Sequence, residues 1–268
     1  MPASNLPRLS DHDFRRLQQM MQEASGIVMA EQKRTLMAGR LMCRLRSLEL
    51  TSYADYLRLL EDPQQQEERR KVIDLLTTNE TYFFREPQHF QVLGDWLAQQ
   101  RGPLKLWSAA SSSGEEAYSM AMTACERAKG DWSIFASDLS RRVLDQARQG
   151  TYKLEQAQKF PPGWLERHCL RGIGDSDGLF RVGQPLRQRV SFAEVNLTRP
   201  LPQELGPFDV IFLRNVLIYF AADEKRAIVT RLVERLRPGG LLFIGHAESL
   251  HGLNLPLRNV RPSVFERL

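Results

Sequence analysis

The stretch Leu104 to Tyr118, with the sequence LKLWSAASSSGEEAY, constrains what this chain can fold into more than any other. A short apolar run over residues 104–107 gives way to a loop of only Ser, Ala and Gly, and an amphipathic run over 115–129 follows. We interpret this order as a strand, a tight turn and a helix. In a doubly wound sheet, such a turn lets a ligand approach the backbone beside the free amides of a helix N-terminus. The loop lacks the G-x-G-x-x-G dinucleotide fingerprint, so on its own it also fits an ordinary connection.

Strand and helix patterns alternate beyond this stretch. The expected elements are a strand over 132–138, a helix over 140–149 closed by Gly150, a fully apolar strand over 208–213, a helix over 223–235, a Pro-Gly-Gly turn over 238–240 and a strand over 241–245. This alternation predicts the α/β class, with an open and mostly parallel sheet.

The N-terminal part shows only helical patterns. Four helices are expected, over 10–25, 30–48, 52–61 and 64–76. Ser10 with Asp13 resembles a capping box, and Thr51 or Ser52 caps the third helix. We therefore expect a small all-helical domain over 1–76 and a second domain over 77–268, in which Pro87 opens a further helix.

One insertion interrupts the alternation, at about residues 172–193. A Gly-rich loop over 172–178 precedes three short runs, 179–182, 183–186 and 188–192, which we expect to form antiparallel strands. Such a subdomain is either decoration or an edge that accepts another peptide strand by backbone pairing.

The charge of the chain is uneven. The net charge is +5 and the pI about 9.3, which leaves nucleic acid, an anionic membrane surface or an acidic protein as partners. Five basic residues and no acidic one lie between positions 33 and 46, namely Lys33, Arg34, Arg40, Arg44 and Arg46. A solvated helix face is the plainer explanation of this run.

Several sequence features argue against other classes of protein. No apolar run reaches the length of a membrane span, and residues 1–8 lack a signal-peptide core, so we expect a cytoplasmic protein. The three cysteines are far apart and the five histidines match no ligand spacing, so we expect neither a disulfide framework nor a metal.

Polar side chains fall at predicted strand ends, where α/β sheets bind ligands. Asp138 ends the second strand and is positioned to accept hydrogen bonds from ribose hydroxyls. Glu115 and Glu116 begin the helix that follows the small-residue loop, although complementarity with the helix dipole also explains an acidic residue there. Arg214, Asn215 and Tyr219 follow the apolar strand over 208–213.

Four motifs together resemble the chemotaxis receptor methyltransferases, the CheR family. They are Thr78-Asn79-x-Thr81-x-Phe83-Phe84-Arg85, Ser111-x-x-Gly114-Glu115-Glu116-x-Tyr118-Ser119, Ala136-Ser137-Asp138 and Arg214-Asn215-Val216-x-Ile218-Tyr219-Phe220. The resemblance covers nearly the whole chain. It implies a helical N-terminal domain, a Rossmann-like S-adenosylmethionine-dependent methyltransferase domain with a small antiparallel β insertion, and methyl transfer to protein glutamate.

The resemblance also implies roles for individual residues. The S-adenosylmethionine pocket would use Asn79, Thr81, Arg85, Glu116, Asp138, Asn196, Leu197, Arg214 and Asn215. Arg85 and Tyr219 match the positions that the family places near the transferred methyl, and are the expected catalytic residues. The loop reads Ser-Ser-Ser-Gly where many relatives have Cys-Ser-Thr-Gly, a change between small residues.

The chemistry needs little beyond alignment. A glutamate side chain has a reference pKa of about 4.3, so it is ionised at neutral pH and attacks a sulfonium methyl without a general base. The expected partners are chemoreceptors, whose acidic helices Arg40, Arg44 and Arg46 would dock and whose C-terminal pentapeptide the β insertion would bind, as it does in some family members. We expect a monomer, with no nucleic acid partner and no membrane insertion.

Two alternatives stay open. A nucleic-acid methyltransferase is compatible with the pI, but the Asn/Asp-Pro-Pro-Tyr motif of amino-directed DNA enzymes is replaced here by Arg214-Asn215-Val216-Leu217. A binding module that senses S-adenosylmethionine without turnover is also compatible, although Arg85 and Tyr219 would then have little purpose.

Overall fold

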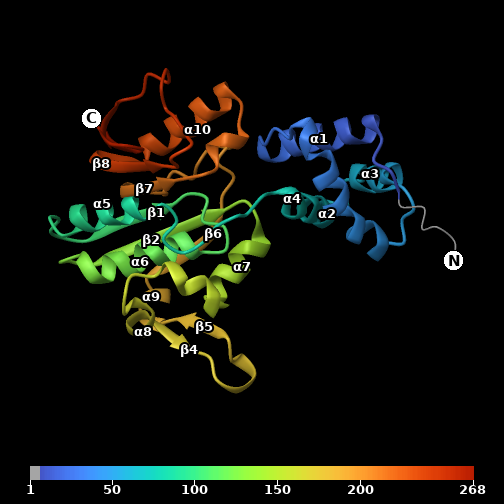
Figure 1. The fold of residues 1–268 in the computed structure, drawn as a ribbon. Helices are drawn as coiled ribbons and strands as arrows, with labels where there is room; N and C mark the ends of the chain where they lie inside the picture. The colour runs from blue at the N-terminus through green and yellow to red at the C-terminus, as the bar shows by residue number, and fades with distance from the viewer. Residues whose placement is uncertain (1–6) are drawn as a thin grey trace. The chain divides into compact units, whose positions relative to one another are not determined.

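The computed structural model describes residues 7–268 (Figure 1). The chain divides into two compact units: the first runs to Thr78 and includes Tyr219–Ala221, and the second holds Asn79–Ile218 and Ala222–Leu268. The expectation drawn from residues 1–8 falls mostly outside the described range. Within that range, no helix combines the length and the apolar composition that a membrane crossing requires.

The first unit is helical, which confirms the all-helical domain. Its helices are α1 (Asp11–Ser25), α2 (Arg34–Ser47, after a 3₁₀ turn over Glu31–Lys33), α3 (Tyr53–Glu61) and α4 (Gln66–Leu76). The side chains of Ser10 and Ser52 accept hydrogen bonds from the amides of Asp13 and Asp55, so both expected caps are present. Gly26 ends α1 in the left-handed conformation.

The core of this unit is apolar, with one buried carboxylate. Phe14 and Leu17 of α1 and Met37 and Leu41 of α2 are fully buried in one apolar cluster. Glu68 is 5% exposed and accepts hydrogen bonds from the Tyr56 hydroxyl and the Arg44 guanidinium. Because that carboxylate is bonded on all sides, Arg44 is part of the internal structure of the unit.

The basic residues of α2 therefore differ in what they do. Arg40 is half-buried and donates to the carbonyl oxygens of Leu76 and Thr77 at the end of α4. Arg44 is paired with Glu68, whereas Arg46 is exposed. The docking role of Arg40, Arg44 and Arg46 stays a prediction, in which Arg46 has the most accessible charge.

The second unit is built on a seven-stranded sheet in the order β6-β2-β1-β7-β8-β10-β9. Its strands are β1 (Leu104–Ser108), β2 (Trp132–Asp138), β6 (Val190–Glu194), β7 (Phe208–Leu213), β8 (Leu236–Ile244), β9 (Leu257–Arg261) and β10 (Val264–Arg267). The first five strands pair in parallel and the last two in antiparallel fashion, which confirms a mostly parallel sheet.

Helices cover this sheet (Figure 1). They include α5 (Pro87–Leu97), α6 (Glu115–Arg127), α7 (Arg141–Gln149) and α10 (Ala222–Glu234). All six residues of the central strand β7 are buried, as expected of a parallel strand covered on both faces. The strand order reverses at β1, which has β2 on one side and β7 on the other. This reversal places a ligand crevice at the carboxyl ends of β1 and β7.

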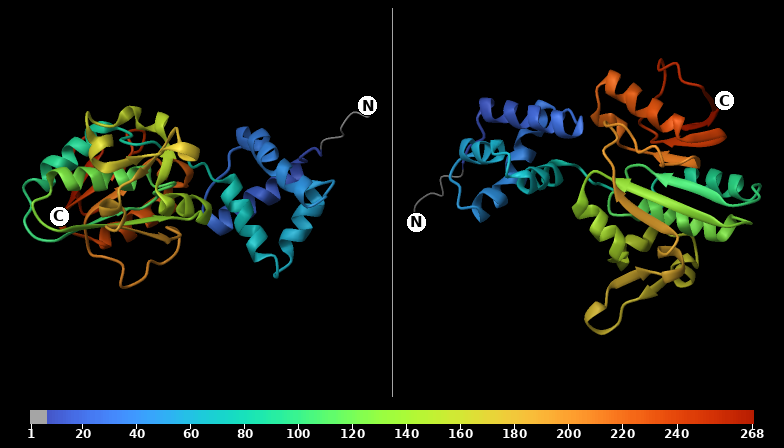
Figure 2. Two further views of the ribbon diagram at one scale, coloured as in Figure 1. Left: turned by 90° about the horizontal axis from the view of Figure 1, so that it is seen from below. Right: turned by 180° about the vertical axis from the view of Figure 1, so that it is seen from behind.

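The small antiparallel sheet is present and the expected strand over 179–182 is its strand β5, but the other two expected strands do not belong to it. Its order is β3-β5-β4, with β3 (Thr151–Lys153), β4 (Cys169–Arg171) and β5 (Leu179–Val182). Strands β4 and β5 and their loop extend away from the main sheet in both Figure 1 and the right view of Figure 2. A short helix α8 (Trp164–His168) precedes β4. Three-residue strands have no periodicity to detect, so β3 and β4 were missed.

Of the other two expected strands of the insertion, one is a helix and one belongs to the main sheet. Residues 184–187 form the helix α9, in which Pro185 occupies the first turn. Residues 190–194 form β6, which pairs in parallel with β2 at the edge of the main sheet. Parallel neighbours require a long crossover, and the segment between β2 and β6, which includes α7 and the small antiparallel sheet, is that crossover.

Two further corrections concern the end of the sheet. The Pro-Gly-Gly segment expected as a turn lies inside β8, where the pairing with β7 shifts register between Phe208 and Val210. The antiparallel pair β9 and β10 was not anticipated from the sequence.

Candidate functional site

The small-residue loop after β1 is tied to the ends of its neighbouring strands. The amide of Ala109 donates to the carbonyl of Phe212 on β7, and that of Ser111 donates to the carbonyl of Ser137 on β2. Gly114 closes the loop with a φ of 97°, and a Cβ added there would lie 2.8 Å from Cβ of Ala147. Only glycine fits this position, so the single Gly of the loop is a packing requirement.

Asp138 lies at the carboxyl end of β2, where the sequence predicted it. Its Oδ2 accepts from the amide of Ser112 at 2.9 Å and its Oδ1 from that of Ser140 at 3.0 Å. The carboxylate is half-buried. These bonds fix its orientation at the rim of the small-residue loop.

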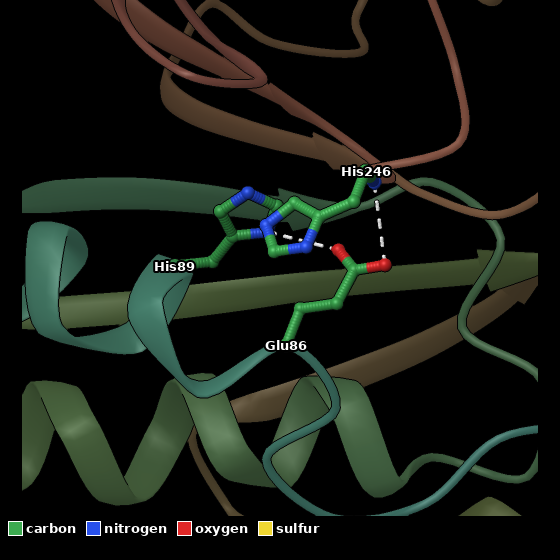
Figure 3. A group of neighbouring side chains, drawn as sticks. All are labelled: Glu86, His89 and His246. Carbon is green, nitrogen blue, oxygen red and sulfur yellow. Dashed lines mark hydrogen bonds and ion pairs between the residues drawn. The ribbon is translucent and has the colours of Figure 1, made fainter.

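Glu86, His89 and His246 form a cluster that sequence spacing did not reveal (Figure 3). One ligand-type atom from each lies within 4.8 Å of the others, an arrangement that could hold a metal ion. His89 is 1% exposed, and burial lowers its pKa to about 3, so its ring is neutral. His89 and His246 are 157 positions apart in the sequence, so no motif revealed the cluster.

The cluster already has a cation. The oxygens of Glu86 accept from Nη2 of Arg214 at 2.9 Å, Nδ2 of Asn215 at 3.3 Å and the amide of His246 at 3.3 Å. A metal ion would compete with the guanidinium of Arg214 for the same carboxylate. We therefore interpret Glu86 as a partner of Arg214, and the absence of a metal stays a prediction.

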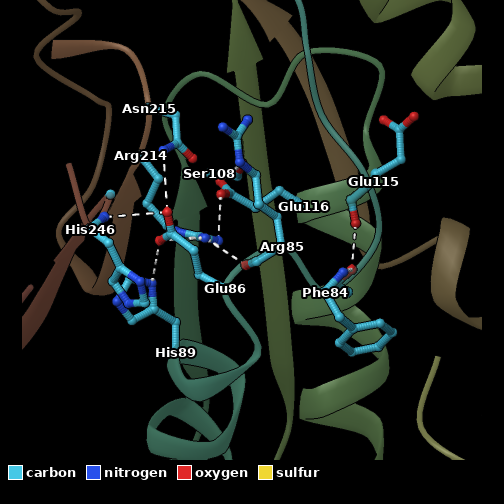
Figure 4. A network of polar contacts seen from close by, with 12 residues as sticks. Phe84, Arg85, Glu86, His89, Ser108, Glu115, Glu116, Arg214, Asn215 and His246 are labelled. Atoms are coloured by element: carbon cyan, nitrogen blue, oxygen red, sulfur yellow. Dashed lines mark hydrogen bonds and ion pairs between the residues drawn. The ribbon is translucent and has the colours of Figure 1, made fainter. Parts of the chain in front are cut away.

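Arg214 connects three segments of the site (Figure 4). It directly follows β7, is 5% exposed, and donates through Nη1 to Oε2 of Glu116 at 3.1 Å. Its Nη2 also donates to the carbonyl of Arg85 at 2.6 Å. Glu116 in turn accepts from the Ser108 hydroxyl at 2.7 Å. One buried guanidinium thus joins the ends of β1 and β7, the start of α6 and the segment before α5.

Two carboxylates share this one guanidinium. Burial raises the pKa of Glu116, and the charge of Arg214 opposes that rise. Burial also acts to raise the pKa of Glu86, but the charge of Arg214 and the hydrogen bonds from Arg214, Asn215 and the amide of His246 together outweigh it, so the pKa of Glu86 is lowered. Removal of one partner of such a buried ion pair lowers the stability of the folded protein strongly, because the other charge is left buried without a partner.

The segment from Asn79 to Arg85 is anchored by its aromatic residues. Phe83 and Phe84 are buried, and the amide of Phe84 donates to the Ser119 hydroxyl of α6 at 2.9 Å. Arg85 is half-buried, bonds the carbonyl of Glu80 at 2.8 Å and lies over the ring of Tyr82. The buried rings before Arg85 and the bond from Arg214 to its carbonyl hold the backbone of Arg85 beside the site.

The carbonyl of Asn79 accepts from the Ser112 hydroxyl at 3.0 Å, which brings this segment against the small-residue loop. Thr81 follows two residues later and is half-buried.

Asn196 and Leu197 follow β6. The amide of Val195 donates to the carbonyl of Asp138, so the chain passes beside the end of β2 just before Asn196. Oδ1 of Asn196 accepts from the amide and the hydroxyl of Thr198, and Leu197 is 8% exposed. These contacts bring the segment that carries Asn196 and Leu197 beside the carboxyl end of β2, and the role of these residues in cofactor binding stays a prediction.

Tyr219 ends a 3₁₀ turn over Leu217–Tyr219 and groups with the first unit. It is half-buried. Its proximity to the reacting groups stays a prediction that rests on its motif.

Sequence reasoning missed two acidic residues of the site. Glu86 directly follows Arg85 and precedes a helix-opening proline, which made it look like an ordinary helix start. Glu248 lies past the end of β8, and its carboxylate bonds the loop that follows Arg214. The position of Glu248 just past a predicted strand could have revealed it, since polar residues after strand ends are site candidates.

Comparison with known proteins gives a consistent result. Residues 12–77 match the family model described as CheR methyltransferase, all-alpha domain, and residues 79–265 match CheR methyltransferase, SAM binding domain. The Chemotaxis protein methyltransferase of Escherichia coli K12 is 46% identical over 248 residues, which cover 91% of this chain and 87% of that protein. Chemotaxis protein methyltransferase 2 of Pseudomonas aeruginosa is 40% identical over 94% of this chain and 92% of that protein.

Proposed function

The chain belongs to the CheR methyltransferase family, and from that premise we propose that it methylates glutamate side chains of chemoreceptor cytoplasmic domains. The methyl donor is S-adenosylmethionine, and the products are glutamate methyl esters and S-adenosylhomocysteine. The observation that carries this proposal is the Glu116–Arg214 pair beside the small-residue loop, at the point where the strand order reverses.

The residues present fit S-adenosylmethionine. The Ser111 hydroxyl is buried in the loop without a hydrogen-bond partner, and a ligand lying against the loop would satisfy it. Glu116 and Asp138 supply carboxylates, which suit a ligand that carries an ammonium group and ribose hydroxyls. The other proposed contacts are Asn79, Thr81, Arg85, Asn196, Leu197, Arg214 and Asn215.

When bound, S-adenosylmethionine supplies a methyl group on a positively charged sulfur, which an ionised carboxylate accepts. The task of the chain is then to hold a substrate carboxylate in line and to keep water from it. Positioning of this kind can contribute about 7 to 11 kcal/mol in the best cases. We assign the hydrogen bonds to the substrate oxygen to the guanidinium of Arg85 and to the hydroxyl of Tyr219.

Two surfaces support the choice of chemoreceptors as substrates. The exposed Arg46 of α2 would attract the acidic helices of a receptor methylation region. Strand β4 is an edge strand in the order β3-β5-β4, and we propose that its outer edge accepts an added peptide strand. Leu170 and Ile173 beside that edge are 65% and 86% exposed, and we propose that they contact the C-terminal pentapeptide of a receptor.

The test is transfer of radiolabelled methyl from S-adenosylmethionine to purified receptor cytoplasmic domains, followed by mild alkali. A glutamate ester releases volatile methanol, which is the expected result. Label that survives alkali would contradict the ester and favour a nucleic-acid or amine substrate. Tight S-adenosylmethionine binding with no transfer to any receptor domain would favour a sensor without turnover.

A further inference from the structure

We propose that Glu248 is a positioning residue for methyl transfer: its carboxylate fixes the backbone of Asn215–Leu217, and with it the groups that this loop presents to the cofactor and substrate. This inference rests on the proposed function. Glu248 belongs to none of the motifs that point to the family, and it lies in the turn that follows β8.

The carboxylate of Glu248 accepts hydrogen bonds from four backbone amides. Oε2 of Glu248 accepts from Gly245 at 2.6 Å and from Asn215 at 2.9 Å. Oε1 accepts from Val216 at 2.9 Å and from Leu217 at 2.7 Å. These amides lie just beyond the ends of β8 and β7, where the sheet no longer supplies acceptors. Hydrogen bonds to an ionised acceptor are roughly twice as strong as neutral ones.

The backbone that Glu248 holds has an uncommon conformation. Asn215 has a φ of 58°, in the left-handed region, which Asn adopts more readily than most residues but which is still uncommon outside glycine. A Cβ on Gly245 would lie 2.9 Å from the amide nitrogen of Asn215 and 2.9 Å from Oε2 of Glu248. The two strand ends therefore approach as closely as glycine allows, with the carboxylate between them.

The loop that Glu248 holds carries site residues on both sides. Asn215 bonds Glu86, and Arg214 directly before it bonds both Glu86 and Glu116. Leu217 begins the turn that ends at Tyr219. Loss of the carboxylate would leave three consecutive amides of this loop without an acceptor. The loop would then relax, and Arg214 and Asn215 would lose their fixed directions.

The experiment compares Glu248→Gln with Asp209→Asn, a control at the opposite end of β7. Asp209 is 7% exposed and its carboxylate likewise accepts a backbone amide, that of Lys105 at 2.7 Å, together with the guanidinium of Arg237. Both variants remove a carboxylate charge from a hydrogen-bonded site in the second unit. For each full-length protein we would measure the unfolding midpoint, the Kd of S-adenosylhomocysteine, and kcat and KM for receptor methylation.

We expect E248Q to weaken S-adenosylhomocysteine binding and to lower kcat, each by about tenfold or more, with the KM for receptor nearly unchanged. D209N should lower the unfolding midpoint and leave Kd and kcat near wild type. Glu248→Asp keeps the charge but shortens the side chain by one methylene, so it should fold and show an intermediate loss. If E248Q does not fold, this shorter variant decides the matter.

Wild-type Kd and kcat in E248Q, or in E248D where E248Q does not fold, would overturn the role of Glu248. Equal losses in D209N and E248Q would also overturn it, because they would show a general effect of destabilisation. A wild-type chain that binds no S-adenosylhomocysteine would overturn the proposed function itself, and the role of Glu248 with it.

Discussion

The guanidinium of Arg214 donates to the carboxylate of Glu116 over 3.1 Å, although the two residues are 98 positions apart in the sequence. Both side chains are shielded from solvent, with relative exposures of 1% and 13%. The pair joins the end of β7 to the first turn of α6. It therefore fixes the two sides of the crevice in which the cofactor is proposed to bind.

Replacement of Arg214 by Ala should destabilise the protein strongly. It leaves two carboxylates, Glu86 and Glu116, buried beside each other without a cation, and such losses cost about 3 to 5 kcal/mol. Denaturant unfolding of the purified variant measures this. The control is Arg258→Ala, which breaks the exposed pair with Glu266 and should cost less than about 1 kcal/mol. Similar losses in both variants would contradict the structural role of Arg214.

Gly114→Ala should disturb the small-residue loop more than its backbone conformation alone explains. The added Cβ would lie 2.8 Å from Cβ of Ala147 and 2.9 Å from the hydroxyl oxygen of Tyr152. Gly102→Ala is the matched control, since Gly102 has a similar φ of 101° with nothing within 4 Å. We expect a lower unfolding midpoint for G114A than for G102A and weaker S-adenosylmethionine binding in G114A alone. Equal effects would mean that the close approach at Gly114 is unimportant.

The neutral His89 should make stability fall in acid. Its pKa of about 3 in the folded state lies below the reference value of 6.5, so the unfolded chain binds more protons between these values. Stability therefore decreases as the pH falls below 6.5, by up to about 1.4 kcal/mol per pH unit from this group. In His89→Gln that part of the slope should disappear, whereas the exposed His251→Gln should retain it. An unchanged slope in H89Q would show that the ring is not buried as a neutral group.

Tyr219→Phe should slow methyl transfer much more than it weakens cofactor binding. The hydroxyl is proposed to hold the substrate oxygen, so its loss acts on kcat and not on the Kd of S-adenosylmethionine. The comparison is Tyr82→Phe, which keeps the ring beneath Arg85 and removes a hydroxyl that carries no proposed role. Loss of binding and rate in equal measure in Y219F would contradict the assignment.

Chelation should leave the enzyme unaffected. The oxygens of Glu86 are bonded to Arg214, Asn215 and the amide of His246, so a metal at the cluster of Glu86, His89 and His246 would have to displace them. Cofactor affinity and methyl transfer measured after treatment with EDTA should equal those of untreated protein. Activity lost to EDTA, restored by Zn²⁺ and insensitive to added metal in His246→Ala would instead identify a metal site.

Local patterns predicted a large part of the fold. The capping serines Ser10 and Ser52, the left-handed Gly26 and the proline at the start of α5 act within one or two turns of the chain, so the sequence shows them directly. The buried run of β7 and the strand–loop–helix at 104–118 are similarly local. The family motifs are also short runs of neighbouring residues, which is why most proposed site residues could be named from the sequence.

Contacts between distant segments could not be predicted in this way. The three-residue strands β3 and β4 have no detectable period, and β6 joins the main sheet only because a long crossover returns it to the side of β2. Arg40 and Arg44 carry charge in a basic run, yet whether a charge is free or paired depends on what packs against it, here the end of α4 and Glu68.

The sequence by itself determined the helical and α/β units, the small-residue loop and the acidic and basic residues after its strands, because periodicity, capping and turn chemistry are properties of neighbouring residues. Only the tertiary structure decided that Arg214 is shared between Glu86 and Glu116, and that Glu248 supports the loop beyond β7. These contacts depend on which strand ends lie side by side at one edge of the sheet. The order of the strands follows from the packing of the whole second unit, and local sequence patterns do not contain that information.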